Sequence, residues 1–491
     1  MYPPDIAEHA PDRTAYVMAG SGHSLTFGEL DERSNRCAHA LGDLGVAPGD
    51  ALVLLLPNGP AWPIVVAAGM RSGLQVVPVN WHLGTAELVP LLTDAAPAAI
   101  VTCGELLPGL LAALDAVPAT PHVLVVDGPA DGALDLESLL AAAPATPIAR
   151  ELLGARVLFS GGTTGRPKAY RQPLLGVHPR EAPKRHPHLA ERLGIEAGIR
   201  FLSPAPSYHA APFTFQLMTL GVGGTVVCLE SFDAVRAIEA IGRHEVTHSQ
   251  WVPTMLSRLL AVPEEQRGGR APSHRVAVTS GAPCPPELKD AVTAWWGPIL
   301  HEYYGASEGY GHTYISPAEA AERRGSVGRP LGTTRVVITD EDGAPAPTGT
   351  VGRVCFGAEP DAPLRGMGDM GRLDDDGYLY LTGRATFMIV SGGVNIYPEE
   401  IEAVVGAMPQ IADVAVFGVP HPDFGEQVMA VVEPAADADP TTLGEEVVAH
   451  CRARLAGFKA PRLVEIVERL PRLETGKLDK RALRARYVAE G

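Results

Sequence analysis

The sequence predicts an α/β protein with a large N-terminal domain of helix-flanked sheets, a small β-barrel-like subdomain and a smaller α+β C-terminal domain. Three observations predict this fold. The first half alternates β-branched or leucine-rich runs with amphipathic stretches, as in parallel sheets covered by helices on both faces. Between Gly325 and Gly383, turn dipeptides and alternating residues indicate antiparallel hairpins. After Arg384, strand-like and helix-like segments mix within about a hundred residues.

The elements of the first half follow in a regular order. The run from Leu25 to Gly45 carries apolar residues at helical spacing and ends at a glycine, which predicts an amphipathic helix. Strands are then predicted at 51–57, 74–80 and 98–103, and helices at 61–73 and 85–95. Further strands are expected near His122 and Arg156, and at 225–230, 246–253 and 275–281.

The C-terminal region has its own pattern. Helices are predicted from about Pro398 and at 442–455, with strands at 414–420, 427–434 and 463–468. The segment 434–440, rich in alanine, aspartate and proline, is a predicted surface loop. The change of pattern predicts an N-terminal domain at 1–383, a hinge at 384–386 and a C-terminal domain at 387–491.

Charge, cysteines and apolar runs argue against several classes of protein. The formal net charge of -17 argues against a nucleic-acid partner, because a surface that binds nucleic acid needs a basic footprint. The six cysteines include no C-x-x-C pair, which favours reduced thiols in a cytoplasmic protein over a disulfide framework or zinc site. The N-terminus has no signal-peptide pattern, and the longest apolar runs are too short to span a membrane.

A glycine-rich stretch from Val157 to Tyr170 follows a predicted strand. Its small residues would let backbone N–H groups approach an anion closely. It is not a Walker loop, because Arg166 and Pro167 separate Gly165 from the lysine that follows. The sequence therefore favours a phosphate grip of another kind, with a mobile glycine-rich connector as the alternative.

Three further segments carry polar residues that suit a nucleotide. Tyr304 and Gly305 follow an apolar run, and the aromatic ring of Tyr304 could meet a base. Glu308, a few residues further, could bind a Mg²⁺ ion or be a solvated loop charge. Asp369 and Arg384 could bind a ribose diol or a phosphate. The run of aspartates before Gly377 is better explained as a hairpin turn than as a metal site.

The last of these segments holds a lysine near the C-terminus. Lys477 is predicted to lie on a loop immediately before a short helix. Such a lysine usually decorates the surface. However, only six of the 40 basic residues of this chain are lysine, so a compact ammonium kept here is more suggestive of a function.

In their order and spacing, these four segments resemble the adenylate-forming superfamily of acyl-CoA synthetases, firefly luciferases and peptide-synthetase adenylation domains. Ser391 to Glu402 and Leu455 to Arg462 resemble the acyl-CoA synthetase forms of its C-terminal motifs. The resemblance covers nearly the whole chain. It implies that Mg-ATP activates a carboxylic acid as an acyl-adenylate with release of pyrophosphate. A mobile C-terminal domain then rotates, and the thiol of coenzyme A takes the acyl group.

The resemblance also implies roles for individual residues. The phosphate grip would comprise Ser160, Gly162, Thr163, Thr164, Gly165 and Lys168. The remaining nucleotide and metal contacts would come from Gly281, Ala282 and Pro283 beside the adenine, Tyr304 stacked on it with Gly305 adjoining, Ser307 at the α-phosphate, Glu308 at Mg²⁺, and Asp369 and Arg384 at the ribose. Lys477 would bridge the substrate carboxylate and the α-phosphate. Gly392 and Gly393 would line the pantetheine tunnel.

His209 matches a pocket histidine of the family beside the acyl and thiol channel, and a role as a plain wall residue stays equally open. The chain departs from the family's usual residues at four positions, namely Gly161, Ala169, Ser307 and Thr386. A neutral hinge at Thr386 is expected to alter the balance between the two domain orientations. None of the four is expected to abolish adenylation.

The acyl pocket implied by the resemblance comprises 210–215, the Gly281 region and 305–311. These segments are mostly small or aromatic, with no arginine for a second carboxylate and no aspartate for an amino group. They favour an apolar, bulky monocarboxylic acid. The segment 176–194 carries three histidines and several basic residues. A surface loop is the first interpretation, a contact for the CoA 3′-phosphate the second, and a metal site the third.

Three functions stay open at this point. The first is an ATP-dependent acyl-CoA ligase using Mg²⁺ and coenzyme A. The second is an acyl-adenylate enzyme that loads the phosphopantetheine arm of a separate carrier protein. The third is a non-catalytic nucleotide-binding homologue, which would have no need for Lys477. A homodimer is a further open partner.

Overall fold

The computed structural model describes residues 1–160, 168–184, 186–305, 309–357, 363–384, 387–391, 394–421, 425–455, 457–473 and 478–488. The chain divides into two compact units. The first comprises Met1–Gly309 and Ser316–Ala318, and the second Tyr310–Ile315 and Glu319–Gly491. The domain boundaries predicted at 383 and 386 lie inside the second unit and stay predictions.

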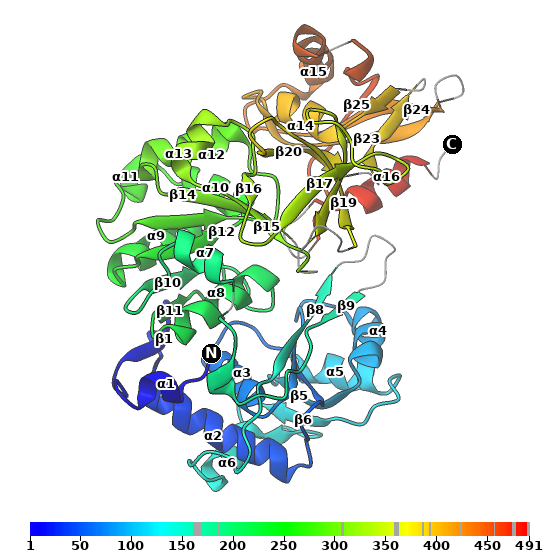
Figure 1. Ribbon diagram of the computed structural model, residues 1–491. Helices are drawn as coiled ribbons and strands as arrows, with labels where there is room; N and C mark the ends of the chain where they lie inside the picture. The colour runs from blue at the N-terminus through cyan, green and yellow to red at the C-terminus, as the bar shows by residue number, and fades with distance from the viewer. Residues whose placement is uncertain are drawn as a thin grey trace. The chain divides into compact units, whose positions relative to one another are not determined.

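The first unit holds two sheets (Figure 1). One has the order β14 (Leu300–Gly305), β13 (Val276–Thr279), β12 (His248–Trp251), β10 (Arg200–Ser203), β11 (Thr225–Cys228), β1 (Thr14–Met18) and β2 (Ser24–Thr26). Its neighbouring strands are parallel except for the antiparallel pair β1 and β2. The helices that follow its strands are α8 (Ala210–Gly221), α9 (Ala234–Arg243), α10 (Pro253–Leu260) and α12 (Pro286–Trp296).

The other sheet of this unit has the order β7 (Leu134–Asp135), β6 (His122–Val125), β5 (Pro97–Thr102), β3 (Ala51–Leu54), β4 (Gln75–Pro78), β8 (Ala155–Ser160) and β9 (Lys168–Arg171). Its neighbours are parallel up to β8, which pairs antiparallel with β9. Its longer helices are α2 (Phe27–Asp43), α3 (Ala61–Arg71), α4 (Thr85–Ala95), α5 (Leu107–Leu114) and α6 (Leu136–Ala142). The strands and helices predicted from the sequence in this half are confirmed.

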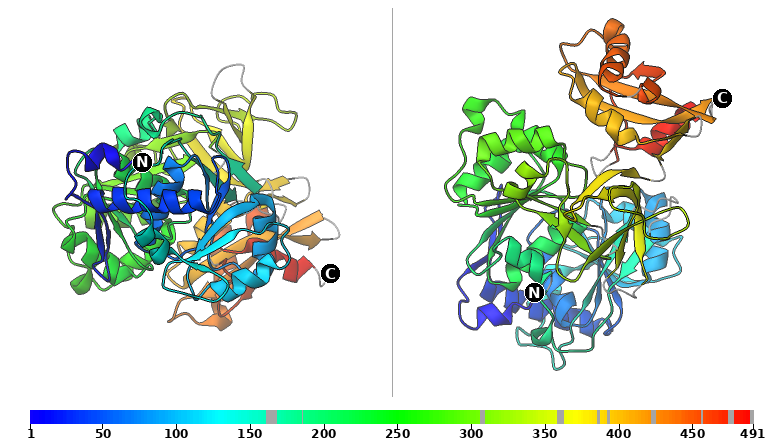
Figure 2. Two further views of the ribbon diagram at one scale, coloured as in Figure 1. Left: turned by 90° about the horizontal axis from the view of Figure 1, so that it is seen from below. Right: turned by 45° about the horizontal axis from the view of Figure 1, so that its top comes forward.

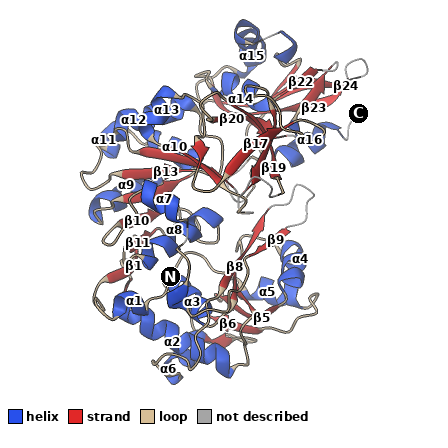
Figure 3. Ribbon diagram, viewed as in Figure 1, coloured by secondary structure: helices blue, strands red, loops and turns tan. Residues whose placement is uncertain are grey.

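Both faces of this sheet are covered by helices. Figure 3 shows its strands in red and the helices in blue. Along β3, Leu52 and Leu54 point into a core shared with α2, α3 and α8, whereas Val53 lies in a second core with α4 and α5. Successive strand residues face opposite sides, so an uninterrupted apolar run indicates burial on both. The two-sided covering predicted from the sequence is therefore confirmed.

The long helix α2 begins where its sequence provides a cap. The Thr26 hydroxyl accepts a hydrogen bond from the Glu29 backbone N–H at 3.1 Å, and the Glu29 carboxylate accepts one from the Thr26 N–H at 2.8 Å. This reciprocal pair satisfies two N–H groups that a helix start leaves without partners. The helix ends before Gly45, which adopts a φ of 84°.

The shorter helices are α1 (Pro4–Ala7), η1 (Pro179–Glu181), α7 (Pro187–Arg192), α11 (Glu264–Arg267) and α13 (Pro317–Glu322). Within the second unit, β15 (His312–Ile315) pairs antiparallel with β16 (Arg329–Pro330). An antiparallel sheet follows in the order β17 (Arg335–Thr339), β18 (Gly352–Gly357), β19 (Arg365–Leu373) and β20 (Leu379–Arg384). Between β19 and β20, the Gly377 N–H donates to the Asp374 carbonyl at 3.0 Å, which confirms the predicted aspartate-rich hairpin turn.

The last sheet comprises β22 (Val394–Ile396), β21 (Ile389–Ser391), β24 (Gly425–Pro434), β23 (Ile411–His421) and β25 (Leu463–Ile466). The helices around it are α14 (Pro398–Gly406), α15 (Pro440–Arg454), η3 (Gly457–Lys459) and α16 (Lys480–Val488). One face of the β23–β24 pair packs against α14 and α15, and the other against Leu483 of α16. The right view of Figure 2 shows this C-terminal sheet, in orange, with its helices. The α+β pattern predicted for the C-terminal region is confirmed.

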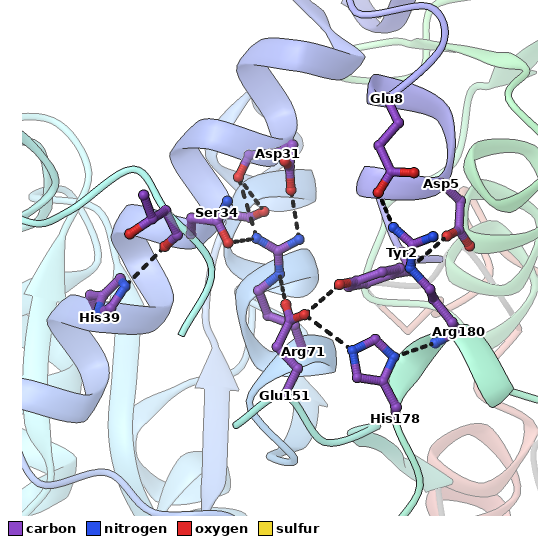
Figure 4. Close-up of polar contacts among 12 residues, drawn as sticks. Tyr2, Asp5, Glu8, Asp31, Ser34, His39, Arg71, Glu151, His178 and Arg180 are labelled. Atoms are coloured by element: carbon purple, nitrogen blue, oxygen red, sulfur yellow. Dashed lines mark hydrogen bonds and ion pairs between the residues drawn. The ribbon is translucent and has the colours of Figure 1, made fainter. Parts of the chain in front are cut away.

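A buried arginine ties together segments of the first unit that are distant in sequence (Figure 4). The Arg71 side chain is 0% exposed and forms ion pairs with Asp31 at 2.6 Å and Glu151 at 3.2 Å. Glu151 also accepts a hydrogen bond from the Tyr2 hydroxyl and lies 3.3 Å from His178. Burial and the neighbouring Glu151 raise the pKa of Tyr2, so this phenol stays protonated.

The same network anchors part of the histidine-containing segment 176–194. Arg180 forms ion pairs with Asp5 and Glu8, and its guanidinium lies 5.6 Å from the centre of the Tyr2 ring. The His178 end of the segment is thereby attached to the N-terminal helix α1. The segment is not only the predicted loop, because it includes η1 (Pro179–Glu181) and α7 (Pro187–Arg192). Among the residues that the structure describes, no helix is both long and apolar enough to cross a membrane.

Candidate active site

One edge of the first unit's mixed sheet gathers several of the predicted residues. Strands β10, β12, β13 and β14 run parallel, so their carboxyl ends meet at the same edge. In sequence β10 is followed by β11 on one side and then by β12 on the other. Open α/β sheets bind ligands outside the carboxyl ends of their strands where the order reverses in this way.

The predicted adenine segments leave two neighbouring strands at this edge. Thr279 of β13 pairs with Glu302 of β14, so Gly281 and Tyr304 each lie two residues further along adjacent strands. Gly281 has a φ of 85°, which an L side chain adopts only with strain. The turn leaves Gly281 and Pro283 exposed, and Ala282, Tyr304 and Gly305 half-buried. The structure thus brings Gly281, Ala282, Pro283, Tyr304 and Gly305 together.

Two consecutive tyrosines at the end of β14 lie on opposite faces of the sheet. Tyr303 faces α8, because its ring lies 6.1 Å from that of Phe215. Glu302, and with it Tyr304 two residues on, lies on the face of α12, where Lys289 forms an ion pair with Glu302. Strand alternation therefore separates a side chain suited to the base from one suited to the acyl group.

The Lys289–Glu302 pair is almost fully buried, with the two side chains 13% and 5% exposed. Burial raises the pKa of Glu302, and the Lys289 ammonium opposes that rise. Cys284 lies close by, and burial raises the pKa of its thiol to about 12. This thiol stays protonated and is not a nucleophile.

His209 lies at the start of α8. His209 is the N-cap residue, and its half-buried ring lies against that of Tyr208, tilted by 55° with a centroid separation of 4.4 Å. Beyond it, Ala210, Ala211 and Thr214 are half-buried, whereas Phe213 and Phe215 are fully buried. The role of 210–215 as a wall of the acyl pocket stays a prediction.

Arg156 was not predicted as a site residue, and it lies beside this wall. Its side chain leaves β8 and is 3% exposed. Its Nη1 donates to the Thr214 hydroxyl at 2.5 Å, and its guanidinium lies 5.7 Å from the centre of the Phe213 ring. An arginine within the otherwise apolar strand sequence 155–159 was the only available signal, and it did not reveal which helix the side chain would meet.

The glycine-rich stretch is described only at its two ends. β8 runs to Ser160 and pairs antiparallel with β9, which begins at Lys168, so Ser160 lies opposite Lys168. A strand follows this loop, whereas a Walker loop is followed by a helix. The exclusion of a Walker loop is therefore confirmed. The residues Gly161, Gly162, Thr163, Thr164 and Gly165 lie outside the described residues, as do Ser307 and Glu308.

The second unit brings the predicted ribose residues to adjacent strands. Asp369 of β19 is directly paired with Arg384 of β20, and Asp369 is 9% exposed. Gly383, immediately before Arg384, has a φ of 139°, and a side chain at this position would collide with Glu399 of α14. The backbone therefore places the two ribose candidates opposite one another.

The remaining C-terminal candidates lie outside the described residues, but their flanks are described. Gly392 and Gly393 join β21 to β22, because Ser391 pairs with Val394. Lys477 precedes α16, and the positions around it are joined by a bridge between Arg472 and Leu478. The predicted short helix after Lys477 is confirmed as Lys480–Val488. The hinge residue Thr386 is also outside the described residues.

Comparisons with known proteins agree with this arrangement. Residues 4–359 match the family model described as AMP-binding enzyme, and residues 400–477 match the AMP-binding enzyme C-terminal domain. A long-chain-fatty-acid–CoA ligase of Mycobacterium tuberculosis is 30% identical over 98% of this chain and 96% of its own. A feruloyl-CoA synthase of an Amycolatopsis species is 32% identical over 99% of this chain and 98% of its own.

Solved structures are similar over the same length. An ATP-bound MatB from Rhodopseudomonas palustris has a TM-score of 0.84 at 27% identity, covering 99% of both chains. An o-succinylbenzoate CoA synthetase from Bacillus subtilis, in complex with its acyl-adenylate intermediate, has a TM-score of 0.83 at 27% identity. It covers 98% of this chain and 97% of its own. This chain therefore belongs to the AMP-binding enzyme family, within the adenylate-forming superfamily that includes the acyl-CoA ligases.

Proposed function

We propose that this protein is an AMP-forming acyl-CoA ligase that activates a bulky, mainly apolar monocarboxylic acid through an acyl-adenylate. The observation that carries the proposal is the meeting of Gly281–Pro283 and Tyr304 at the sheet edge. An exposed turn beside an aromatic ring suits an adenine. The family match over both parts of the chain supports the chemistry.

In the first half-reaction, a carboxylate oxygen of the acid attacks the α-phosphorus of ATP. A new P–O bond forms and the bond to pyrophosphate breaks. Negative charge spreads over the carboxylate and the phosphate, so a fixed ammonium such as that of Lys477 stabilises the transition state. The β8–β9 hairpin, with Ser160 and Lys168 at its ends, would hold the departing pyrophosphate.

A magnesium ion would neutralise phosphate oxygens of ATP when bound. Glu308 follows the carboxyl end of β14 and offers the oxygen ligand that Mg²⁺ prefers. Asp369 and Arg384 would hold the ribose from neighbouring strands.

In the second half-reaction, the thiol of coenzyme A attacks the acyl carbon. The C–S bond forms, AMP leaves, and the thiol proton passes to solvent or a base. Gly392 and Gly393, which follow β21 in the sequence, would give the pantetheine arm room because they carry no side chain. A rotation of the C-terminal domain between the half-reactions is part of the proposal.

The acid itself is inferred from the α8 wall. The half-buried Ala210 and Ala211 leave space, and the aromatic residues behind them are apolar. A bulky, mainly apolar acyl group fits this composition. The six free cysteines fit the reducing environment of the cytoplasm, where we place the protein.

A panel of acids tests the function. Purified protein with Mg-ATP would be assayed for pyrophosphate release, and then for thioester with coenzyme A or with a holo-carrier protein. Pyrophosphate release followed by a CoA thioester is the expected result. A thioester formed only with the carrier protein would favour the second acceptor, and no pyrophosphate with any acid would favour a non-catalytic homologue.

Lys477→Ala tests the role of the catalytic lysine. We expect adenylation to fall by at least about a hundredfold, because an ammonium that stabilises the transition state is lost. Transfer to coenzyme A from a preformed acyl-adenylate should be retained, since the phosphorus chemistry is already complete. Equal loss of both half-reactions would contradict this role. Arg243→Ala, at an exposed position on α9, is the control.

A further inference from the structure

We propose that Arg156 and Thr214 form a polar subsite in the wall of the acyl site. This polar subsite selects acids that carry a hydroxyl group remote from the reacting carboxylate. This inference rests on the proposed function and narrows its substrate class. It starts from the contact between β8 and α8, where the Arg156 Nη1 lies 2.5 Å from the Thr214 hydroxyl. Thr214 is half-buried, whereas Arg156 is 3% exposed.

The hydrogen bonds of Thr214 fix what it can offer. Its hydroxyl donates to the Ala210 carbonyl at 2.7 Å, which uses its one proton. Its oxygen accepts from Arg156, which uses one of two lone pairs. The remaining lone pair can therefore only accept, and a ligand that meets it needs an O–H or N–H donor.

A second hydroxyl faces the same region from β14. The Tyr303 ring lies 6.1 Å from Phe215 of α8, and the side chain is half-buried. Burial raises the pKa of Tyr303, and Ser280 and the positive charge of Arg156 oppose that rise. Strand β14 thus brings a further hydroxyl-bearing side chain to α8, the helix that carries Thr214.

A hydroxyl group on the ligand suits this polar subsite in two ways. Its proton can be donated to Thr214, and its oxygen is favoured by the positive field of the guanidinium. An amine would also donate, but the nearby guanidinium would repel its positive charge. In this proposal Arg156 acts through its hydrogen bond to Thr214 and is therefore a positioning residue. The rest of the wall is apolar, so the acid is largely hydrophobic with one hydroxyl.

Matched pairs of acids test the proposal. The pairs would differ by one terminal hydroxyl, for example octanoate against 8-hydroxyoctanoate, and 3-phenylpropionate against 3-(4-hydroxyphenyl)propionate. We expect at least one pair to show about a tenfold or larger preference for the hydroxylated acid in kcat/KM for pyrophosphate release, because sites built to bind a hydroxyl discriminate against its absence. Pairs without any preference, in an enzyme that adenylates the parent acids, would overturn it.

Variants separate this role from a purely structural one. Thr214→Val should abolish the preference, and Thr214→Ser should keep it, because serine retains the hydroxyl. Arg156→Met should reduce the ratio between paired acids, whereas a structural defect would lower both acids alike. Arg171→Met is the control, because Arg171 lies on the paired strand β9 and contacts Asp94 instead.

Each outcome of these experiments supports or overturns the proposal. An unchanged preference in Thr214→Val, or a lost one in Thr214→Ser, would overturn the proposal. If Arg156→Met does not fold, as judged by circular dichroism, the two Thr214 variants decide alone. Absence of pyrophosphate with every acid is a distinct result that overturns the proposed function, and the inference falls with it.

Discussion

Two arginines of the first unit differ in what surrounds them. Arg71 is 0% exposed and pairs with Asp31 and Glu151, of which Glu151 is only 7% exposed. Arg243 pairs with Glu239 one helical turn away, and both side chains are more than half exposed. An exposed pair is screened by water, whereas the removal of one partner from a buried group leaves charge without compensation.

Arg71→Met should therefore be strongly destabilising. We expect a loss of about 3–5 kcal/mol in the free energy of unfolding, because Glu151 keeps a buried charge. Arg243→Met, the matched control on α9, should change it by less than about 0.5 kcal/mol. Urea unfolding followed by circular dichroism measures both. Similar shifts in the two variants would contradict the argument.

A buried histidine gives the first unit a pH dependence. His248 is 2% exposed, its Nε2 lies 2.8 Å from the Leu193 carbonyl, and its Nδ1 lies 2.8 Å from the Thr247 hydroxyl. Burial lowers its pKa to about 4, helped by the charge of Arg275 and opposed by hydrogen bonds to backbone carbonyls. The pKa of the neighbouring His274 is lowered as well, partly through His248.

The pKa of His248 determines in which direction the pH changes the stability of the fold. The folded pKa of His248 lies below the unfolded value of 6.5, so the unfolded state binds the proton first as the pH falls. Above pH 6.5 His248 is neutral in both states and does not change the free energy of unfolding. Between pH 6.5 and about pH 4, protonation of the unfolded state lowers the free energy of unfolding by up to roughly 3 kcal/mol. His248→Gln should make the unfolding midpoint less dependent on pH in this window. Parallel curves for the two proteins would refute this assignment.

At the scale of elements, backbone conformation distinguishes two glycines. Gly281 follows β13 with a φ of 85°, next to the proposed adenine site. Gly42 lies on the exposed side of helix α2 with nothing near the place of a side chain. The same substitution therefore meets strain in one case and a favourable helical conformation in the other.

Gly281→Ala should weaken nucleotide binding. Strain of about 1–2 kcal/mol in the turn should raise KM for ATP by roughly tenfold, with a smaller effect on the fold. Gly42→Ala should leave KM unchanged and stabilise α2 by about 0.5–1 kcal/mol. Steady-state pyrophosphate release and thermal unfolding measure the two quantities. An unchanged KM in Gly281→Ala would argue against this turn as a nucleotide contact.

At the scale of the whole molecule, the proposed reaction needs the C-terminal domain in two orientations. The predicted hinge at 384–386 begins with the ribose candidate Arg384 and ends immediately before Phe387. Phe387 lies 5.7 Å from the Lys480 ammonium, which is also paired with Glu402 at 2.7 Å. The residue after the hinge is thus attached to the C-terminal sheet's helices, so a rotation would be confined to the few residues before it.

Thr386→Pro tests this requirement. Proline restricts φ to about -65° and would oppose a large backbone rotation at the hinge. We expect adenylation to be nearly unchanged and thioester formation to slow by at least about tenfold. Single-turnover assays of each half-reaction measure the effect, with Thr386→Ser as the control. Unchanged thioester formation would place the hinge elsewhere.

The order of strands and helices and the separation of the nucleotide segments could be predicted from the sequence. These features depend on local patterns, such as the apolar period of α2, its cap and the continuous apolar run of β3. The strand before the glycine-rich stretch and the exclusion of a Walker loop could also be predicted from the sequence, whereas the strand β9 that follows was shown only by the structure. The resemblance to the adenylate-forming superfamily then followed from the order of the segments.

The polar partners of buried charges were decided only by the tertiary structure. Arg156 and Thr214 are 58 residues apart and lie on a strand of one sheet and a helix beside another. Glu302 and Tyr303 are neighbours in sequence, yet strand alternation sends one towards Lys289 and the other towards α8. Periodicity determines which side of an element is buried, but the identity of the side chain that meets it depends on how distant segments pack. The sequence by itself therefore determined the family and the elements, and packing decided which side chains meet in the wall proposed for the acyl site.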